Sequence, residues 1–263
     1  MNYHKKYTSA INKAISFAIK THEIDQKQKR KGKDVAYIEH PLTVGLILSL
    51  AGASEDVIIA GLLHDTIEDS DEQHKVTVEI IEDQFGKNVA ELVLSVTETD
   101  KGLSWEERKK EALEHITHFS HDSLLLKSAD IISNVSEMII DYDVEGDNFF
   151  ARFNAPKEKI IENQLRAIAA IIQNWPNTPL AYDLISLAIR LQEIGSFELM
   201  LKYPAPVIEY KDYDENIYLE CPVCGWRETS ENRGSKNTDS NFCMDISCRI
   251  CDKMILVANY PSA

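Results

Sequence analysis

Long apolar runs are missing from this sequence of 263 residues. The amino-terminal stretch MNYHKKYTSA holds no apolar segment of signal-peptide length, and no window approaches the roughly 20 apolar residues of a membrane span. Hydrophobic residues make up 44% and charged residues 27%, which excludes a collagen-like or wholly disordered chain. We therefore expect a globular, cytoplasmic protein with one large domain and an accessory module.

Basic residues are also in deficit. The chain has 28 Lys and Arg against 43 Asp and Glu, and the net charge of −15 repels nucleic acid at long range. The deficit is uneven, because residues 1–36 carry nine basic and three acidic side chains. The sequence therefore disfavours general nucleic-acid binding and predicts a local cationic patch on an acidic body.

Cysteine is absent from the first 220 residues, and all five cysteines lie in the last 43. In a reducing compartment, cysteines gathered in this way indicate a metal site rather than disulfides. We therefore expect the tail to be a module separate from the rest of the chain.

Helical periodicity and capping signals predict an all-helical core before residue 205. We expect helices at 3–21, 40–51, from 54 onward, 77–85, 89–96, 105–118, 124–140, 157–173 and 180–194. The segment 22–33 is expected to be too polar for burial. Two prolines at 204 and 206 interrupt the pattern, and short β-prone pieces follow at 217–219 and 254–257. The predicted organisation is a helical domain at 1–201, a linker at 202–216 and a small β module at 217–263.

The densest group of ionisable residues lies in GLLHDTIED, residues 61–69. On one continuous helix, His64, Asp65, Glu68 and Asp69 would share a polar arc at the end of an apolar segment. Taken alone, a His-Asp pair in such a pattern is more typical of a helix C-terminus with solvated acids.

Two further residues favour a metal site. His40 stands at the start of the preceding helix, and Asp130 lies in the mostly apolar stretch LLLKSADII, residues 124–132. An unpaired carboxylate there costs on the order of several kcal/mol, so Asp130 needs either a metal or an ion pair with Lys127. Two imidazoles and two carboxylates suit one divalent transition metal, with positions left for water and substrate.

These residues belong to an ordered set of motifs: QKRK at 28–31, YIEHP at 37–41, LLHDTIED at 62–69, FG at 85–86, VTE at 96–98, RK at 108–109 and LKSADIISN at 126–134. Over about residues 10–195 the set resembles the HD-domain metallohydrolases, and within them the alarmone hydrolases related to the RelA/SpoT hydrolase half. The resemblance implies a mainly α fold, the HD-domain helical bundle. It also implies removal of pyrophosphate from the 3′ position of guanosine tetra- or pentaphosphate.

The resemblance further implies roles for single residues. One catalytic metal, usually manganese (Mn²⁺) in this subfamily, would be held by His40, His64, Asp65 and Asp130. The attacking water would be handled by Glu68 and Asp69. The nucleotide substrate would be contacted or framed by Arg30, Lys31, Lys127 and Asn134. This agrees with general chemistry, since a metal lowers the pKa of its water and a nearby carboxylate can take the proton.

Three departures from the family pattern concern the substrate. The family usually places a histidine closer to the Gln-x-Arg than His22 lies to Arg30, Ala36 replaces a common proline, and 131–133 replace basic and bulky residues. One alternative is therefore an HD phosphohydrolase for another nucleotide, such as a nucleoside monophosphate or a signalling dinucleotide. The other is a nucleotide sensor that is read out through the tail.

The tail contains two Cys-x-x-Cys pairs, Cys221/Cys224 and Cys248/Cys251. Each pair can present two thiolates to a tetrahedral zinc ion (Zn²⁺), and the doubled pattern resembles a zinc ribbon. The 23 intervening residues exceed the usual spacing of about 15–20, and Cys243 is a rival ligand. We expect a structural zinc, in a module that binds a protein partner or regulates the helical domain.

Overall fold

The computed structural model describes residues 7–98, 102–197, 207–221, 226–232, 236–237, 243–250 and 254–260. The chain divides into two compact units, Met1–Ser196 and Phe197–Ala263. The first is helical, the second consists mainly of strands, and each is described by itself.

The described part of the helical unit contains α1 (Ser9–Ile19), a π-helix (Lys20–Asp25), α2 (Glu39–Leu50), α3 (Glu55–Leu63), α4 (Thr66–Asp69), α5 (Val78–Phe85), α6 (Lys87–Val96), α7 (Trp105–Ile116), α8 (His121–Glu145), a 3-10 helix (Gly146–Arg152), α9 (Lys157–Asn174) and α10 (Ala181–Gly195). No helix in the described part of the chain combines the length and apolar character that crossing a membrane requires.

Local capping explains where several helices begin. Ser54, Thr77 and Ser104 each have extended backbone and accept a hydrogen bond from the main-chain N–H three residues further on. At Ser104 the side chain of Glu107 also accepts from the Ser104 main-chain N–H, which completes a capping box. The predicted starts of α3, α5 and α7 are therefore confirmed.

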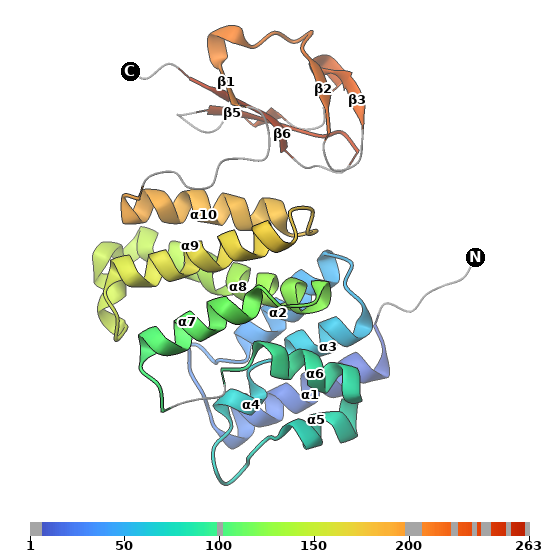
Figure 1. Cartoon of the computed structure of the whole chain (residues 1–263), viewed down its shortest axis with the longest axis vertical. Helices are drawn as coiled ribbons and strands as arrows, with labels where there is room; N and C mark the ends of the chain where they lie inside the picture. The colour runs from blue at the N-terminus through green and yellow to red at the C-terminus, as the bar shows by residue number, and fades with distance from the viewer. Residues whose placement is uncertain are drawn as a thin grey trace, which may run out of the picture. The chain divides into compact units, whose positions relative to one another are not determined.

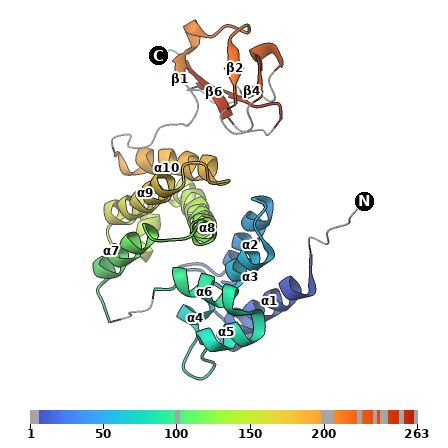
Figure 2. The same ribbon diagram turned by 45° about the vertical axis from the view of Figure 1, so that its right-hand side comes forward.

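Helix α8 is the central element of the helical unit. It packs against α2, α3 and α6 and also against α9 and α10. Figures 1 and 2 show α9 and α10 on one side of α8, with α2 and α3 on the other. Residues predicted from the sequence at 124–140 therefore lie in a longer helix, 121–145, that reaches both parts of the bundle.

Helices α2 and α3 approach closely because each has a glycine where they meet. A Cβ on Gly45 would lie 2.7 Å from Leu62 Cδ2, and one on Gly61 would overlap the Leu48 side chain. Leu48 and Leu63 are completely buried in this contact region. The close packing places the start of α2 beside the end of α3.

The segment after α1 differs from the sequence expectation. The helix does not end near residue 21 but continues as the π-helix Lys20–Asp25, and His22 in it is only 1% exposed. The expectation that residues 22–33 are too polar for burial is therefore wrong for His22. Burial is possible because the imidazole bonds to Gln28 and packs on the Tyr37 ring.

The second unit contains a four-stranded sheet in the order β1-β6-β5-β4 and a separate hairpin of β2 and β3. The described strands are β1 (Val207–Glu209), β2 (Tyr218–Glu220), β3 (Arg227–Thr229), β4 (Lys236–Asn237), β5 (Cys243–Ser247) and β6 (Met254–Asn259), with 3-10 turns at Tyr210–Asp212 and Ser230–Asn232. β1 runs parallel to β6, and the other described pairs are antiparallel.

Part of the expected linker 202–216 belongs to this β unit. Val207 pairs with Val257, so β1 adds an edge to the sheet. Residues 202–206 lie outside the described residues. The strand was not predicted because two prolines precede the short β-prone segment Val207-Ile208. This segment becomes a strand by hydrogen bonding to β6.

Candidate metal centre and nucleotide cleft

The chain turns sharply at His64 and Asp65, between α3 and α4. Asp65 precedes α4 with φ −92° and ψ −6°, and the Thr66 hydroxyl donates to the Leu63 carbonyl at 2.7 Å. The expectation of one continuous helix through residues 61–69 is therefore wrong. The turn directs His64 and Asp65 toward α2, while Glu68 and Asp69 belong to the short α4.

Four side chains from two helices, α2 and α8, and this turn converge on one point. The Nε2 atoms of His40 and His64 lie 3.2 Å apart. Asp65 Oδ2 lies 3.0 Å from His64 Nε2 and 3.5 Å from His40 Nε2. Asp130 Oδ1 lies 3.4 Å from His40 Nε2 and 3.8 Å from His64 Nε2. The structure thus brings together two nitrogens and two carboxylate oxygens.

The other ring nitrogen of each histidine has a partner that orients the ring. His64 Nδ1 lies 2.9 Å from the carbonyl of Gly61 and donates to it, because a carbonyl can only accept. His40 Nδ1 lies 2.9 Å from Ser133 Oγ on α8. Both Nε2 atoms therefore face the shared centre, as those of metal-ligating histidines do.

The donor set fits a divalent metal ion. Metal–nitrogen bonds of about 2.1 Å at angles between 90° and 109° place two ligand nitrogens about 3.0–3.4 Å apart. The observed 3.2 Å lies in that interval, and the ligand atoms of His40, His64 and Asp65 all lie within 4.8 Å of one another. Mixed imidazole and carboxylate donors suit manganese, iron, cobalt or zinc.

The two carboxylates are also held from outside the centre. The Tyr37 hydroxyl donates to Asp65 Oδ2 at 2.5 Å. Asp130 accepts from Lys127 Nζ at 2.8 Å and from Asn134 Nδ2 at 2.7 Å. The metal and ion-pair interpretations of Asp130 are therefore compatible, because one oxygen faces Lys127 and the other faces the histidines.

Electrostatics keep these carboxylates ionised. Burial raises the pKa of Asp130, but Lys127 and the two histidines lower it well below its ordinary value. Burial likewise raises the pKa of Asp65, and His64 and His40 more than offset this effect, so it is lowered overall. Burial lowers the pKa of His64, whereas Asp65 and Asp130 raise it to about 9. The centre thus attracts positive charge, as a cation site does.

The acidic pair of α4 splits into two environments. Glu68 lines the same cavity as His64 and Asp65, and its Oε2 accepts from the Glu98 main-chain N–H at 3.3 Å. Burial, then the charges of Asp65 and Glu98, raise the pKa of Glu68. Asp69 Oδ2 instead accepts from Gln28 Nε2 at 2.8 Å. Burial and Asp65 raise the pKa of Asp69, and the bond from Gln28 opposes that rise.

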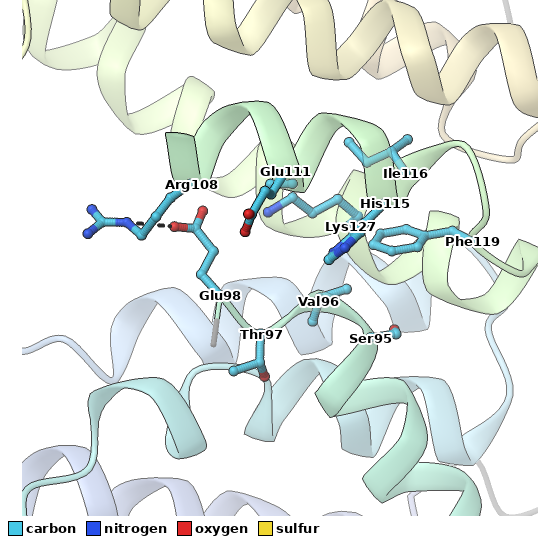
Figure 3. A pocket seen from close by; sticks show the side chains of 11 residues that line it. Ser95, Val96, Thr97, Glu98, Arg108, Glu111, His115, Ile116, Phe119 and Lys127 are labelled. Carbon is cyan, nitrogen blue, oxygen red and sulfur yellow. Dashed lines mark ion pairs between the residues drawn. The ribbon is translucent and has the colours of Figure 1, made fainter. Parts of the chain in front are cut away.

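Glu98 connects this region to α7. Its carboxylate pairs with Lys109 at 2.5 Å and with Arg108 at 3.4 Å. Figure 3 shows Glu98 directed toward Arg108 in a cavity of about 500 Å³, with Glu111 and Lys127 also lining it. Two cations therefore offset the charge that Glu98 places near Glu68.

The predicted nucleotide contacts differ in how far their charges are already paired. Arg30 donates to Glu137 on α8 and to Asn134 Oδ1, the latter at 2.9 Å. Lys127 is paired with Asp130. Lys31 makes no ion pair with the residues that the structure describes, and its Nζ lies 5.1 Å from the centre of the Phe153 ring. Lys31 is therefore the predicted contact whose charge is least compensated.

Two neighbouring cavities share several lining residues. One of about 840 Å³ is lined by the metal-centre residues His64, Asp65 and Asp130. The other, of about 1110 Å³, is lined by the 28–33 loop together with Trp105, Phe149 and Phe153. Both are bordered by Tyr37, Lys109, Asn134, Asn163 and Gln164. The arrangement joins a metal-binding end to a broader end with cations and aromatic rings, which suits a phosphorylated nucleotide.

Comparison with known proteins agrees with this geometry. Residues 14–155, more than half of the chain, match the HD domain family. The chain belongs to that family. The HD domain match covers all four converging side chains and both acids of α4.

Several curated relatives of this HD domain are named guanosine-3′,5′-bis(diphosphate) 3′-pyrophosphohydrolases. The zebrafish MESH1 protein is 38% identical over 133 residues, which are 50% of this chain and 70% of the relative. The Aquifex aeolicus protein is 36% identical over 140 residues, 52% of this chain and 19% of that longer protein. The latter match thus covers only a part of its relative.

Solved structures show the same HD fold. One, described as a metazoan ortholog of SpoT that hydrolyses ppGpp, has a TM-score of 0.55 and 26% identity over 73% of this chain and 96% of its own. A protein of Listeria monocytogenes EGD-e has a TM-score of 0.54 and 30% identity, covering 60% of this chain and 99% of its own.

Some site residues were not singled out from the sequence. Ser133 follows Asp130 by three positions on α8 and so lies on the same helix face, and Glu137 follows Asn134 by three. Helical spacing from Asp130 was the signal that could have identified both. Tyr37 and Gln28 stand inside the matching motifs, but their partners Asp65 and Asp69 are far along the chain, so only the fold reveals these contacts.

In the β unit, Cys221 and Cys248 are each 1% exposed and belong to its core with Leu219, Met244 and Ile246. Cys224 and Cys251 lie outside the described residues. Cys243 is half-buried on β5, with its thiol 3.5 Å from Asp245 Oδ1. Two of the four expected zinc ligands thus have a described place in the β unit.

Proposed function

We propose that this HD-domain protein is a metal-dependent hydrolase that removes the 3′ pyrophosphate from guanosine tetra- or pentaphosphate. The observation that carries the proposal is the convergence of His40, His64, Asp65 and Asp130 beside a cavity that Glu68 also lines. The pyrophosphohydrolase relatives support the choice of reaction and substrate.

We propose Mn²⁺ as the metal and His40, His64, Asp65 and Asp130 as its ligands. A bound divalent ion supplies Lewis-acid chemistry, polarising the phosphoryl group and lowering the pKa of a coordinated water. The protein holds the four donors through Ser133, Gly61, Tyr37 and Lys127. Such outer contacts fix the ligand geometry before substrate arrives.

Glu68 is the proposed general base. Hydrolysis forms a bond from the water oxygen to the phosphorus attached to the 3′ oxygen and breaks the bond between that phosphorus and the 3′ oxygen, which takes up a proton to become the 3′ hydroxyl. The tetraphosphate then yields GDP and pyrophosphate. Glu68 takes the proton that the attacking water loses, and its raised pKa brings it nearer the working pH of such a base. Asp69 supports that transfer from the neighbouring position on α4.

Lys31, Arg30, Lys127 and Asn134 are the proposed nucleotide contacts. Lys31 lies beside the Phe153 ring and has no ion pair within the described part of the chain, so it is the first partner for a phosphate. Arg30 keeps its bond to Glu137 and presents its remaining N–H groups. Lys127 and Asn134 both bond to Asp130, and these contacts support a role for them beside a phosphate at the metal.

A substrate screen with Mn²⁺ tests the proposal. The full chain is mixed with guanosine tetraphosphate, a nucleoside monophosphate and a signalling dinucleotide, and released products are separated by chromatography. We expect GDP and pyrophosphate from the tetraphosphate alone. Turnover of another nucleotide instead would identify that nucleotide as the substrate. Tight binding without turnover would indicate a nucleotide sensor.

We also propose a structural Zn²⁺ in the β unit, held by Cys221, Cys224, Cys248 and Cys251. The burial of Cys221 and Cys248 in the apolar core supports this, since a closed zinc site keeps its thiolates from water. The Ile250 main-chain N–H lies 3.4 Å from Cys248 Sγ and can donate to it. Zinc analysis tests the ligand set: Cys221→Ser should lose the ion and Cys243→Ser should keep it.

A further inference from the structure

His22 is buried and Gln28 is half-buried close to the acidic pair of α4, and neither has a role in the reaction described so far. The Gln28 side chain lies between two partners, with Nε2 2.8 Å from Asp69 Oδ2 and Oε1 2.8 Å from His22 Nδ1. A continuous chain of hydrogen bonds therefore runs from the π-helix to the acidic pair of α4.

The order of donors and acceptors in these hydrogen bonds follows from the last residue in the series, Asp69. An Asp69 carboxylate only accepts, so the Gln28 amide must turn its NH₂ group toward Asp69 and its oxygen toward His22. That oxygen in turn needs a donor, so His22 carries its proton on Nδ1. His22 Nε2 is buried and has no hydrogen-bond partner in the described part of the chain. The bond to Gln28 is thus the one polar contact described for this imidazole.

The backbone is shaped to make this contact. The π-helix widens the turn at His22, and Lys27 adopts a left-handed conformation with φ 52°. As a result the Gln28 main-chain N–H donates to the His22 carbonyl at 2.8 Å, although six positions separate the two residues. A π-helical insertion that places a polar side chain is typical of functional positions. The spacing between His22 and Arg30, which is longer than in the family pattern, therefore still allows the contact between His22 and Gln28.

We propose that His22 and Gln28 are positioning residues for Asp69, which they hold in the orientation that assists proton transfer. The proposal rests on the hydrolase function assigned to Glu68 and Asp69. His22 fixes which way the Gln28 amide faces, and Gln28 fixes which Asp69 oxygen is occupied. The other Asp69 oxygen then keeps one direction relative to Glu68, the preceding residue on α4.

Two substitutions of His22 separate this role from packing. Asn places an amide nitrogen where the imidazole has Nδ1, whereas Gln places its amide near the position of Nε2. We expect His22→Asn to retain most of the wild-type kcat. His22→Gln, and His22→Phe with its similar ring, should lower kcat about 10–100-fold, the scale of a misplaced catalytic group, while KM changes little. Equal losses in the Asn and Gln proteins would overturn the proposal.

A double-mutant cycle identifies the residue through which His22 acts. If His22 works through Asp69, His22→Phe should have no further effect on kcat in an Asp69→Asn protein. Multiplicative losses would show that His22 acts independently. The cycle is run with the best nucleotide from the substrate screen, so the result does not depend on that nucleotide being guanosine tetraphosphate.

Nuclear magnetic resonance of the ¹⁵N-labelled full chain gives a readout apart from activity. The His22 ring should show the Nδ1-protonated tautomer, with an exchange-protected proton that disappears in Gln28→Met. An Nε2-protonated ring would refute the hydrogen-bond chain. A protected Nδ1 proton together with failure to hydrolyse guanosine tetraphosphate would instead count against the proposed substrate alone.

Discussion

The candidate metal centre of the helical unit and the cysteines of the β unit are both buried, but in different surroundings. His40 and His64 are 3% and 4% exposed, and Cys221 and Cys248 are each 1% exposed. His64, however, lines the same cavity as Glu68. The two cysteines are surrounded by the apolar side chains of β2, β5 and β6.

This contrast separates two uses of a metal. A centre that borders a cavity leaves coordination positions for substrate, whereas thiolates inside an apolar core leave none. The helical unit also has a large apolar core of its own, including Leu126, Ile168 and Leu184, which are completely buried. The described β unit is small, so a metal there contributes directly to folding. The first site is therefore expected to serve reaction and the second to serve stability.

Removal of all metal should give the largest effects, and these effects should differ between the two units. Exhaustive chelation of the full chain should abolish turnover while the helices stay folded, because their core does not include the metal. The β unit should unfold, since structural zinc contributes about 10–16 kcal/mol in zinc-finger peptides. Amide NMR signals from α8 and from β6 report the two outcomes separately. Persistence of the β6 signals in zinc-free protein would contradict the structural role.

Glu68→Gln should affect the helical site alone. Loss of a positioned general base lowers kcat by about 10²–10⁴-fold, while manganese and zinc contents stay at their wild-type values. Single-turnover kinetics and metal analysis measure the two effects. A wild-type rate would transfer the base function to Asp69.

Ser133→Ala should weaken metal binding without removing a ligand. The substitution deletes the partner of His40 Nδ1, and loss of such an outer contact costs about 10–100-fold in metal affinity. Ser128→Ala is the matched control: Ser128 is a buried serine of α8 whose hydroxyl donates to the Leu124 carbonyl instead of a ligand. Isothermal titration with Mn²⁺ should separate the two variants. Equal affinities would show that the ring of His40 is held by packing alone.

The smallest effect concerns the stability of metal-free protein. Folding raises the pKa of Glu68, so its ionisation costs stability above the folded pKa, and the cost vanishes as the pH falls below the ordinary value of 4.5. Glu68→Gln should therefore raise the Tm at pH 7, with the gain shrinking toward acid pH. Glu72→Gln, at an exposed position, should leave the Tm unchanged. A gain that grows toward acid pH would contradict the assigned sign.

Much of the helical unit could be predicted because its signals are local. Caps at Ser54, Thr77 and Ser104 act within one helical turn, so the sequence alone places these helix starts. The HD domain family and the pyrophosphohydrolase resemblance are confirmed, because the motifs occur in the family's order.

Other features depend on contacts distant in sequence. The break at His64–Asp65 interrupts an apparently continuous helical pattern, and the burial of His22 follows from a π-helix and from Tyr37. Strand β1 forms because β6, fifty residues later, offers it an edge. None of these follows from hydrophobic periodicity, since each requires knowing which segments meet.

Gly61 links the packing of the bundle to the size of ion that the centre accepts. It has no side chain where α2 and α3 meet, and its carbonyl also receives the His64 Nδ1 proton. The 3.2 Å gap between the two imidazoles is therefore a property of helix spacing as well as of the ligands themselves. A methyl group at Gly61 would press on the Leu48 and Val44 side chains of α2, and a separation of the two helices in response would widen that gap, which favours larger ions over smaller ones. Ionic selectivity at this candidate centre would thus depend partly on a residue that does not touch the ion.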